Sequence, residues 1–192
     1  MPVSGQLTAV IEDLASAQAR LRTLHAALPC HAWSRRPTPD RWSPAECVAH
    51  LNLTSETLLP LLRAGLQQAR DRRGPAASRY RRDPVGWLIW KLVSPSGRLK
   101  TSTVPAFVPR GPQPADSLMS EFERLQGEVV SCAREAAGLP IDRVKLVSPF
   151  DARVKYNLYA ALTLVPRHQH RHLLQAERAG QVCAPFASAL TV

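Results

Sequence analysis

Apolar residues recur at intervals of three and four positions in four long stretches of the chain. This spacing is typical of helices that bury one face. We expect four long helices, over residues 4–28, from residue 43 past residue 62, over 115–137 and over 155–179. Proline or glycine follows the first and third of them, as is common where helices end. Four amphipathic helices predict an all-α fold, an antiparallel four-helix bundle.

The regular pattern breaks between residues 74 and 112. Asp83 and Pro84 are of the types preferred where a helix begins, so we expect a short helix after them. Several prolines then favour extended chain. Because this insert is longer than most connections, we expect it to serve as a lid, a pocket wall or a dimer contact. A length of 192 residues suits a single domain over residues 1–192.

The second helix opens with Ser43, Pro44 and Glu46. Serine as the cap, proline at the first helical position and glutamate at the third make a capping box. Glu46 also lies one turn before His50, which makes it a candidate general base or a support for a ligand as well as a cap. His50 falls on the core-facing stripe of this helix. Alone, a histidine in that position is more typical of a satisfied core residue than of a metal ligand.

The fourth helix carries the segment PRHQHRHLLQAER at residues 166–178. His168 and His172 are four residues apart and share a face that continues the apolar stripe, whereas His170 points elsewhere, towards the surface. Two buried imidazoles need hydrogen-bond partners or a metal ion. The pair is therefore either part of a metal site or a capped, partly exposed histidine pair. Gln175, one turn past His172, could hydrogen-bond a ligand or a bound water.

In a helical bundle, inward side chains of facing helices build metal sites. His50, His168 and His172 would together supply three imidazole nitrogens. Three histidines with a vacant position are typical of open, catalytic sites rather than closed, structural ones. Neutral imidazoles suit Zn, Ni or Fe(II) better than Mg or Ca. The helical phases therefore favour a divalent-metal site with these three ligands and leave satisfied core histidines as the alternative.

The formal net charge of +10 invites a nucleic-acid hypothesis. The positive charge is densest from Arg70 to Arg82, in a stretch that reads as a solvated linker. An arginine-rich surface without a macromolecular partner, or one that favours an anionic small-molecule substrate, fits the composition better. Nucleic-acid binding through Arg70–Arg82 is kept as the weaker alternative.

The four cysteines are scattered and form no CxxC motif, which indicates reduced thiols in a cytoplasmic protein. The N-terminal residues lack a basic segment followed by an apolar one, so we expect no signal peptide. No apolar run approaches the roughly 20 residues of a membrane span, so we expect no membrane association.

Two motifs resemble those of the DinB-like superfamily, which includes the YfiT-type metal-dependent hydrolases. WSPAECVAHL at residues 42–51 is similar to W-S-x-x-E-x-x-x-H-L, and HQHRHLLQAER at residues 168–178 is similar to H-x-x-x-H-L-x-Q. The proline-rich SRRPTPDRW is a weaker third match. The resemblance implies a four-helix bundle, a divalent metal (Ni or Zn) held by His50, His168 and His172, and homodimers. Characterised relatives include S-transferases that use low-molecular-weight thiols, and isomerases.

Three functional hypotheses follow. The first is a divalent-metal-dependent enzyme that activates water or a low-molecular-weight thiol towards a small electrophilic substrate, as a thiol S-transferase or hydrolase. Glu46 and Gln175 are its candidate catalytic and supporting residues. The second is a non-catalytic, metal-binding stress-response bundle that acts as a dimer. The third is nucleic-acid binding, which requires the arginines between Arg70 and Arg82 to share one exposed face.

Overall fold

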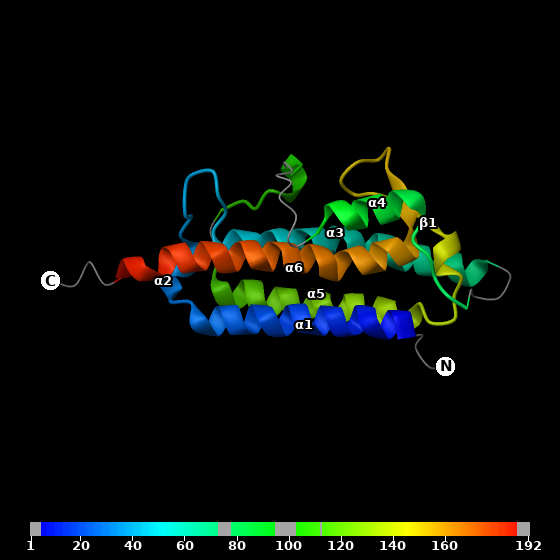
Figure 1. Ribbon diagram of the computed structural model, residues 1–192, viewed down its shortest axis with the longest axis horizontal. Helices are drawn as coiled ribbons and strands as arrows, with labels where there is room; N and C mark the ends of the chain where they lie inside the picture. Colours follow the sequence, from blue (N-terminus) through cyan, green and yellow to red (C-terminus); the bar gives the residue numbers. More distant parts are fainter. Residues whose placement is uncertain (1–4, 73–77, 95–102, 112, 188–192) are drawn as a thin grey trace.

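Six α-helices, three short 3-10 helices (Pro105–Phe107, Ile141–Arg143 and Ala184–Ala187) and one small hairpin are the regular elements of the described part of the chain (Figure 1). The computed structural model describes residues 5–72, 78–94, 103–111 and 113–187. The helices are α1 (Gly5–Ala27), α2 (Cys30–Ser34), α3 (Pro44–Asp71), α4 (Pro84–Leu92), α5 (Ala115–Glu135) and α6 (Leu158–Cys183). The strands are β1 (Lys145–Val147) and β2 (Lys155–Asn157). The fold is thus mostly helical, and the four long helices lie where the apolar spacing predicts them.

The four long helices pack side by side, α3 against α5 and α6, and α1 against the same two helices (Figure 1). Their apolar stripes face inward. Leu7 and Leu14 of α1, Leu62 of α3 and Val129 of α5 have no exposed surface. The stripe read from the sequence is therefore the buried stripe, and burial of this apolar surface holds the helices together. No helix among the described residues is long and apolar enough to cross a membrane.

Two of the four neighbouring helix pairs run parallel, not antiparallel. Asn52 near the start of α3 donates to the carbonyl of Leu118 near the start of α5 at 3.0 Å. Further along, Arg70 pairs with Glu135 at 2.5 Å, so residue numbers rise together on both helices. The same is true of α1 and α6, where Arg20 near the end of one helix pairs with Glu177 near the end of the other at 2.5 Å.

The expectation that all neighbours are antiparallel is therefore wrong for α3 with α5 and for α1 with α6. It holds for α3 with α6 and for α1 with α5. In the second pair, the Leu14 carbonyl of α1 accepts a hydrogen bond from the Gln126 side chain of α5. The reason is the connection between α3 and α5. Because both helices begin at the same end, the chain between them must return along the whole length of α3 (Figure 1). Long crossover connections of this kind occur in helical bundles, and here the crossover is the insert of residues 74–112.

The start of α3 has the predicted capping box. The Ser43 hydroxyl accepts from the Glu46 backbone N–H at 3.2 Å, and the Glu46 carboxylate accepts from the Ser43 N–H at 2.9 Å. Asp83 likewise caps α4, where its carboxylate accepts from the N–H of Gly86 at 3.2 Å. Both local predictions are confirmed because capping depends only on residues within one turn.

The fourth long helix begins later than predicted, because residues 155–157 are a strand. β1 and β2 pair antiparallel, with Leu146 opposite Tyr156 and both side chains buried. Asn157 then ends the strand and caps α6, since its side-chain oxygen accepts from the N–H of Ala160 at 2.8 Å. The helix passes through Pro166 and ends at Cys183, four residues beyond the expected Ala179. The small sheet is a departure from the all-α expectation.

The close approach of α4 to α6 depends on Gly86. A Cβ placed there would overlap Ala160 of α6 and would lie 2.7 Å from a carboxylate oxygen of Asp83. Farther along, Arg167 of α6 donates to the Trp90 carbonyl at 2.6 Å and stacks on the Trp90 ring at 3.7 Å. The helix of the insert is therefore docked on α6 by backbone proximity at one end and by an arginine at the other.

Gly86→Ala is expected to lower the free energy of unfolding by about 1–3 kcal/mol, because the added methyl must displace α4 or α6. Gly127→Ala on α5 is the matched control, since nothing lies within 4 Å of its added Cβ. That change should stabilise the protein by about 0.5–1 kcal/mol through helix propensity. Urea unfolding followed by circular dichroism measures both, and equal effects of the two changes would contradict the close packing.

Candidate metal centre

The three predicted histidines meet where α3 packs against α6. The ring centroid of His50 lies 4.4 Å from that of His172 and 5.1 Å from that of His168. Each ring offers one nitrogen to a cluster whose members lie within 4.8 Å of one another. His170, the third histidine of the segment, lies outside the cluster. It is half-buried beside α1, where Arg20 donates to its carbonyl at 3.3 Å, and is not the surface residue that the sequence predicts.

Hydrogen bonds to two of the rings determine which nitrogen is free. The Nδ1 of His50 lies 2.8 Å from the Phe107 carbonyl oxygen, and the Nδ1 of His172 lies 3.1 Å from the Gln175 side-chain oxygen. Both oxygens can only accept, so both Nδ1 atoms carry the proton. The Nε2 atoms are then unprotonated, and the Nε2 of His50 faces the Nε2 of His168 at 3.3 Å. Metal-binding histidines commonly have this arrangement, in which the outer nitrogen donates and the inner one binds.

All three imidazoles are poor proton acceptors. Burial lowers the pKa of His50, against a smaller opposing contribution from the Phe107 carbonyl. Burial also lowers the pKa of His172 to about 3, helped by His50 and Arg171. The pKa of His168 is well below its usual value for the same first reason, and next because of His172 and His50. The rings are therefore neutral at pH 7, which is the state that binds metal ions.

The donor set fits a divalent transition metal. Among the described residues, the one histidine, cysteine or carboxylate cluster compact enough to share an ion consists of His50, His168 and His172. Three neutral imidazoles favour Zn, Ni or Fe(II), whereas Mg and Ca prefer oxygen ligands. Three protein ligands also leave a coordination position for water or a substrate, as in catalytic rather than structural zinc sites.

Aromatic rings flank the histidines on two sides. The Trp42 ring lies 5.0 Å from that of His50 and 6.0 Å from that of His172. On the other side, Phe150 lies 6.3 Å from His168 and 4.5 Å from Phe107. In the sequence, Trp42 stands out as the first residue of the motif at residues 42–51, and neither phenylalanine is singled out. Of these three aromatic residues, only Trp42 has a sequence signal, which is its position directly before the cap of α3.

A cavity of about 1030 Å³ opens over the histidines. Its walls come from α3, α6, the loop before α3, the hairpin loop and two parts of the insert. The insert contributes Ile89 and Leu92 of α4 with the adjoining Val93, and farther along Thr103, Val104 and Val108. Of the three roles expected for the insert, that of a pocket wall matches the place of α4. Pockets of this size with mostly apolar walls and a few polar groups are typical of sites for small molecules.

A family model described as the DinB superfamily matches residues 13–176 of the chain. The chain belongs to the DinB superfamily. This match confirms the resemblance read from the two motifs, and it includes all three histidines of the cluster. Comparisons with curated proteins and with solved structures give no match.

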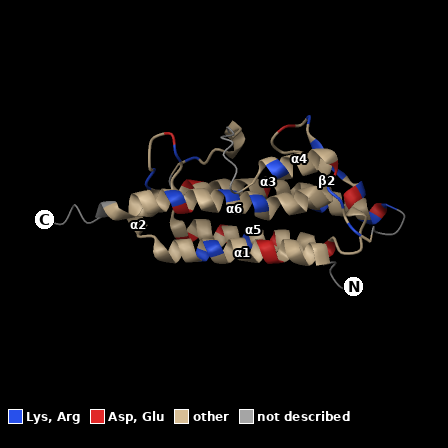
Figure 2. Ribbon diagram, viewed as in Figure 1, with Lys and Arg blue, Asp and Glu red and all other residues tan. Residues whose placement is uncertain are grey.

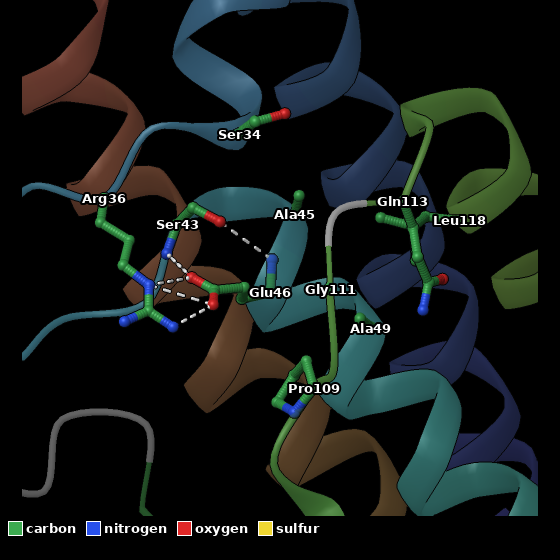
Figure 3. A pocket seen from close by; sticks show the side chains of 10 residues that line it. All are labelled: Ser34, Arg36, Ser43, Ala45, Glu46, Ala49, Pro109, Gly111, Gln113 and Leu118. Carbon is green, nitrogen blue, oxygen red and sulfur yellow. Dashed lines mark hydrogen bonds and ion pairs between the residues drawn. The ribbon is translucent and has the colours of Figure 1, made fainter.

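Glu46, the candidate general base of this DinB-superfamily protein, is held by other groups. Its carboxylate accepts from Arg36 Nε at 2.8 Å as well as from the Ser43 N–H (Figure 3). Burial alone would raise its pKa, but these hydrogen bonds and the charge of Arg36 outweigh burial and lower it. Glu46 lines a separate cavity of about 320 Å³ and is not among the residues around the histidine cavity. A catalytic role for Glu46 stays a prediction, and what the geometry shows is a cap and an ion pair.

The arginines between Arg70 and Arg82 have partners within the chain at both ends of that stretch. Arg70 pairs with Glu135 of α5, and Arg82 donates to the Thr163 hydroxyl at 2.7 Å and stacks on Trp90 at 4.3 Å. Residues 73–77 lie outside the described part of the chain. Figure 2 shows basic and acidic residues interspersed along the long helices. These contacts lend no support to a single basic face, and nucleic-acid binding stays the weaker alternative.

Replacing Gln175 by alanine is expected to weaken divalent-metal binding about 10- to 100-fold, because His172 loses the acceptor that orients its ring. Gln181→Ala, at an exposed position on the same helix, is the matched control and should leave the affinity unchanged. Competition against a chromophoric chelator measures both. Equal affinities for the two variants would show that the bond to Gln175 does not support a ligand.

The stability of the metal-free protein should depend on pH through the buried histidines. Their pKa values are lowered on folding, so the unfolded chain binds protons first as the pH falls below about 6.5. Stability is therefore greatest above that pH and is lost as the pH falls towards about 3, the pKa of His172. Each such histidine contributes a slope of up to about 1.4 kcal/mol per pH unit.

His172→Gln should flatten this dependence. Urea unfolding in the presence of a chelator, repeated between pH 7 and pH 5, measures the slopes of variant and parent. Parallel curves would mean that His172 is protonated in the folded protein as readily as in the unfolded chain.

Proposed function

We propose that this DinB-superfamily protein is a divalent-metal-dependent enzyme whose metal is held by His50, His168 and His172. The proposed reaction is attack of water or a low-molecular-weight thiol on a small electrophilic substrate, as in a hydrolase or a thiol S-transferase. The observation that carries the proposal is the convergence of three neutral imidazoles at a cavity of about 1030 Å³. In two of them, a hydrogen bond from Nδ1 leaves Nε2 unprotonated. Bound at these nitrogens, zinc or nickel would act as a Lewis acid that lowers the pKa of the attacking group.

The chain's own residues prepare the site in two ways. The Phe107 carbonyl and the Gln175 side chain hold the outer nitrogens of His50 and His172, which orients both rings and fixes their tautomers. Trp42 and Phe150 cover the sides of the cluster and reduce its contact with water. Electrostatic interactions are stronger where water is excluded, so these rings increase the effect of any charge held there.

The positive charge near the cluster favours an anionic nucleophile or substrate. Arg171 lies close enough to lower the pKa values of His168 and His172. Its side chain donates to the Ser94 carbonyl at 3.1 Å, so part of its position is set by the chain just past the end of α4. A fixed cation at this distance attracts a thiolate or a carboxylate. We also infer that the four long helices form a bundle with a crossover and that the protein acts as a homodimer, as the family resemblance implies. The scattered cysteines support a cytoplasmic location.

A non-catalytic, metal-binding bundle is the second candidate, and the state of the nearby carboxylates favours it. Glu46 is bound to Arg36, and its pKa is lowered. Asp151 at the cavity wall has a pKa lowered to about 2 by hydrogen bonds from Arg153. Neither carboxylate is a strong base at neutral pH. A thiol that loses its proton at the metal needs no such base, which is why the S-transferase form of the enzyme hypothesis is preferred.

Metal analysis of protein purified without a nickel column tests the proposal. One equivalent of zinc, nickel or iron is expected in the parent protein, with loss of at least about 90% in His168→Ala because a three-ligand site rarely survives as two. His170→Ala is the matched control on the same helix and should keep the metal. Metal retained by His168→Ala would refute the site.

Conjugation of low-molecular-weight thiols to a generic electrophile then separates the two candidates. The enzyme hypothesis expects turnover that the His168→Ala change abolishes. Stoichiometric metal with no turnover for several thiols, and no hydrolysis of activated esters, would favour the non-catalytic bundle.

A further inference from the structure

The cavity over the histidines is an elongated groove along α6. Residues of every turn of α6 from Ala161 to Val182 line it, so the lined stripe runs along most of the helix. At a rise of ~1.5 Å per residue this stripe is roughly 30 Å long. His168 and His172 lie near its middle. A bound molecule can therefore extend from the histidines in both directions.

One half of the groove is mostly apolar, and Thr54, Ser55 and Asp151 are polar residues that also line the cavity. Leu164 and Val165 of α6 lie on the N-terminal side of His168, and Leu58 of α3 and Ile89 and Leu92 of α4 line the same cavity. Leu92 lines the cavity, and its side chain is apolar, yet the residue is 46% exposed to solvent. An apolar chain laid in this half would cover such surface, which is favourable in proportion to the area removed from water.

The other half carries positive charge. On the C-terminal side of His172, Arg178 of α6 and Arg41 of the loop before α3 line the groove, both exposed. Asp40 is the carboxylate in this half, so the arginines outnumber it. Leu174 and Val182 leave some apolar surface here as well. Arg178 lies six residues beyond His172, a distance of ~9 Å along the helix axis.

We propose that the groove binds an amphiphilic anion, a carboxylate with an unbranched apolar chain, with its head at Arg178 and Arg41 and its chain against α4. The middle of such a molecule would pass over the three histidines. This inference deepens the proposed function, on which it rests, because it assigns a substrate class to the same site. Neither half alone indicates this class, since an apolar pocket accepts many neutral molecules and two surface arginines accept many anions.

Titration of the full-length protein with decanoate and with decanol, followed by tryptophan fluorescence, tests the class of ligand. Decanoate should bind about threefold to fivefold more tightly than decanol, the difference typical of an exposed ion pair. Arg178→Ala should bring the two affinities together. Arg134→Ala, an exposed arginine on α5 away from the groove, is the matched control for the loss of one charge and should preserve the ratio.

A second pair of variants, both on α4, tests the apolar half. Leu92→Ser should weaken binding of both ligands about threefold or more through the loss of apolar contact. Leu88→Ser removes a leucine that is 52% exposed but does not line the groove, and should leave both affinities unchanged. Equal weakening by the two changes would indicate adsorption to the outer face of α4 and would overturn the proposal.

Binding is measured with and without a chelator, so its outcome is separate from that of the metal and activity experiments. A preference for decanoate that persists with the chelator supports the groove even if the protein proves not to be an enzyme. Equal binding of decanoate and decanol by the parent protein, or no saturable binding of either, would overturn this inference and leave the metal site untouched.

Discussion

The contact between α3 and α6 is the interaction on which the site depends. It brings His50 to His168 and His172 and buries imidazoles that would otherwise be hydrated. Burying polar rings is costly unless their nitrogens have partners. Here the outer nitrogens of His50 and His172 bond to Phe107 and Gln175, and the inner nitrogen of His50 faces that of His168. The low pKa values follow from the same burial, so packing, neutrality and readiness for a metal have one cause.

The crossover between α3 and α5 has a topological and a chemical role. Because α3 and α5 are parallel, the chain must pass back along the helices, and its helix α4 lies against α6. On the way it forms α4, which closes one side of the cavity, and it supplies the Phe107 carbonyl that holds His50. A plain up-and-down arrangement with short loops would have neither. The length of the insert, which looks excessive in the sequence, is what this topology requires.

The surroundings of the histidines combine features that favour different parts of a ligand. Aromatic rings cover the cluster, the apolar side of the groove follows α4, and arginines lie on the opposite side. A metal centre alone would not select among electrophiles. Under the proposed function, this selection would fall to the walls of the groove, which come from the crossover, the hairpin loop and the loop before α3 as well as from the histidine-bearing helices.

The sequence by itself determined the long helices, their buried faces, the capping box at Ser43 and the three histidines. These are consequences of spacing and of contacts within one or two turns, which periodicity reports directly. Tertiary structure alone decided the direction of neighbouring helices, the hairpin before α6 and the carbonyl of Phe107 as the partner of His50. Helix direction depends on how a connection runs through space. A backbone carbonyl is the same at every residue, so no residue type marks the one that a distant histidine will contact.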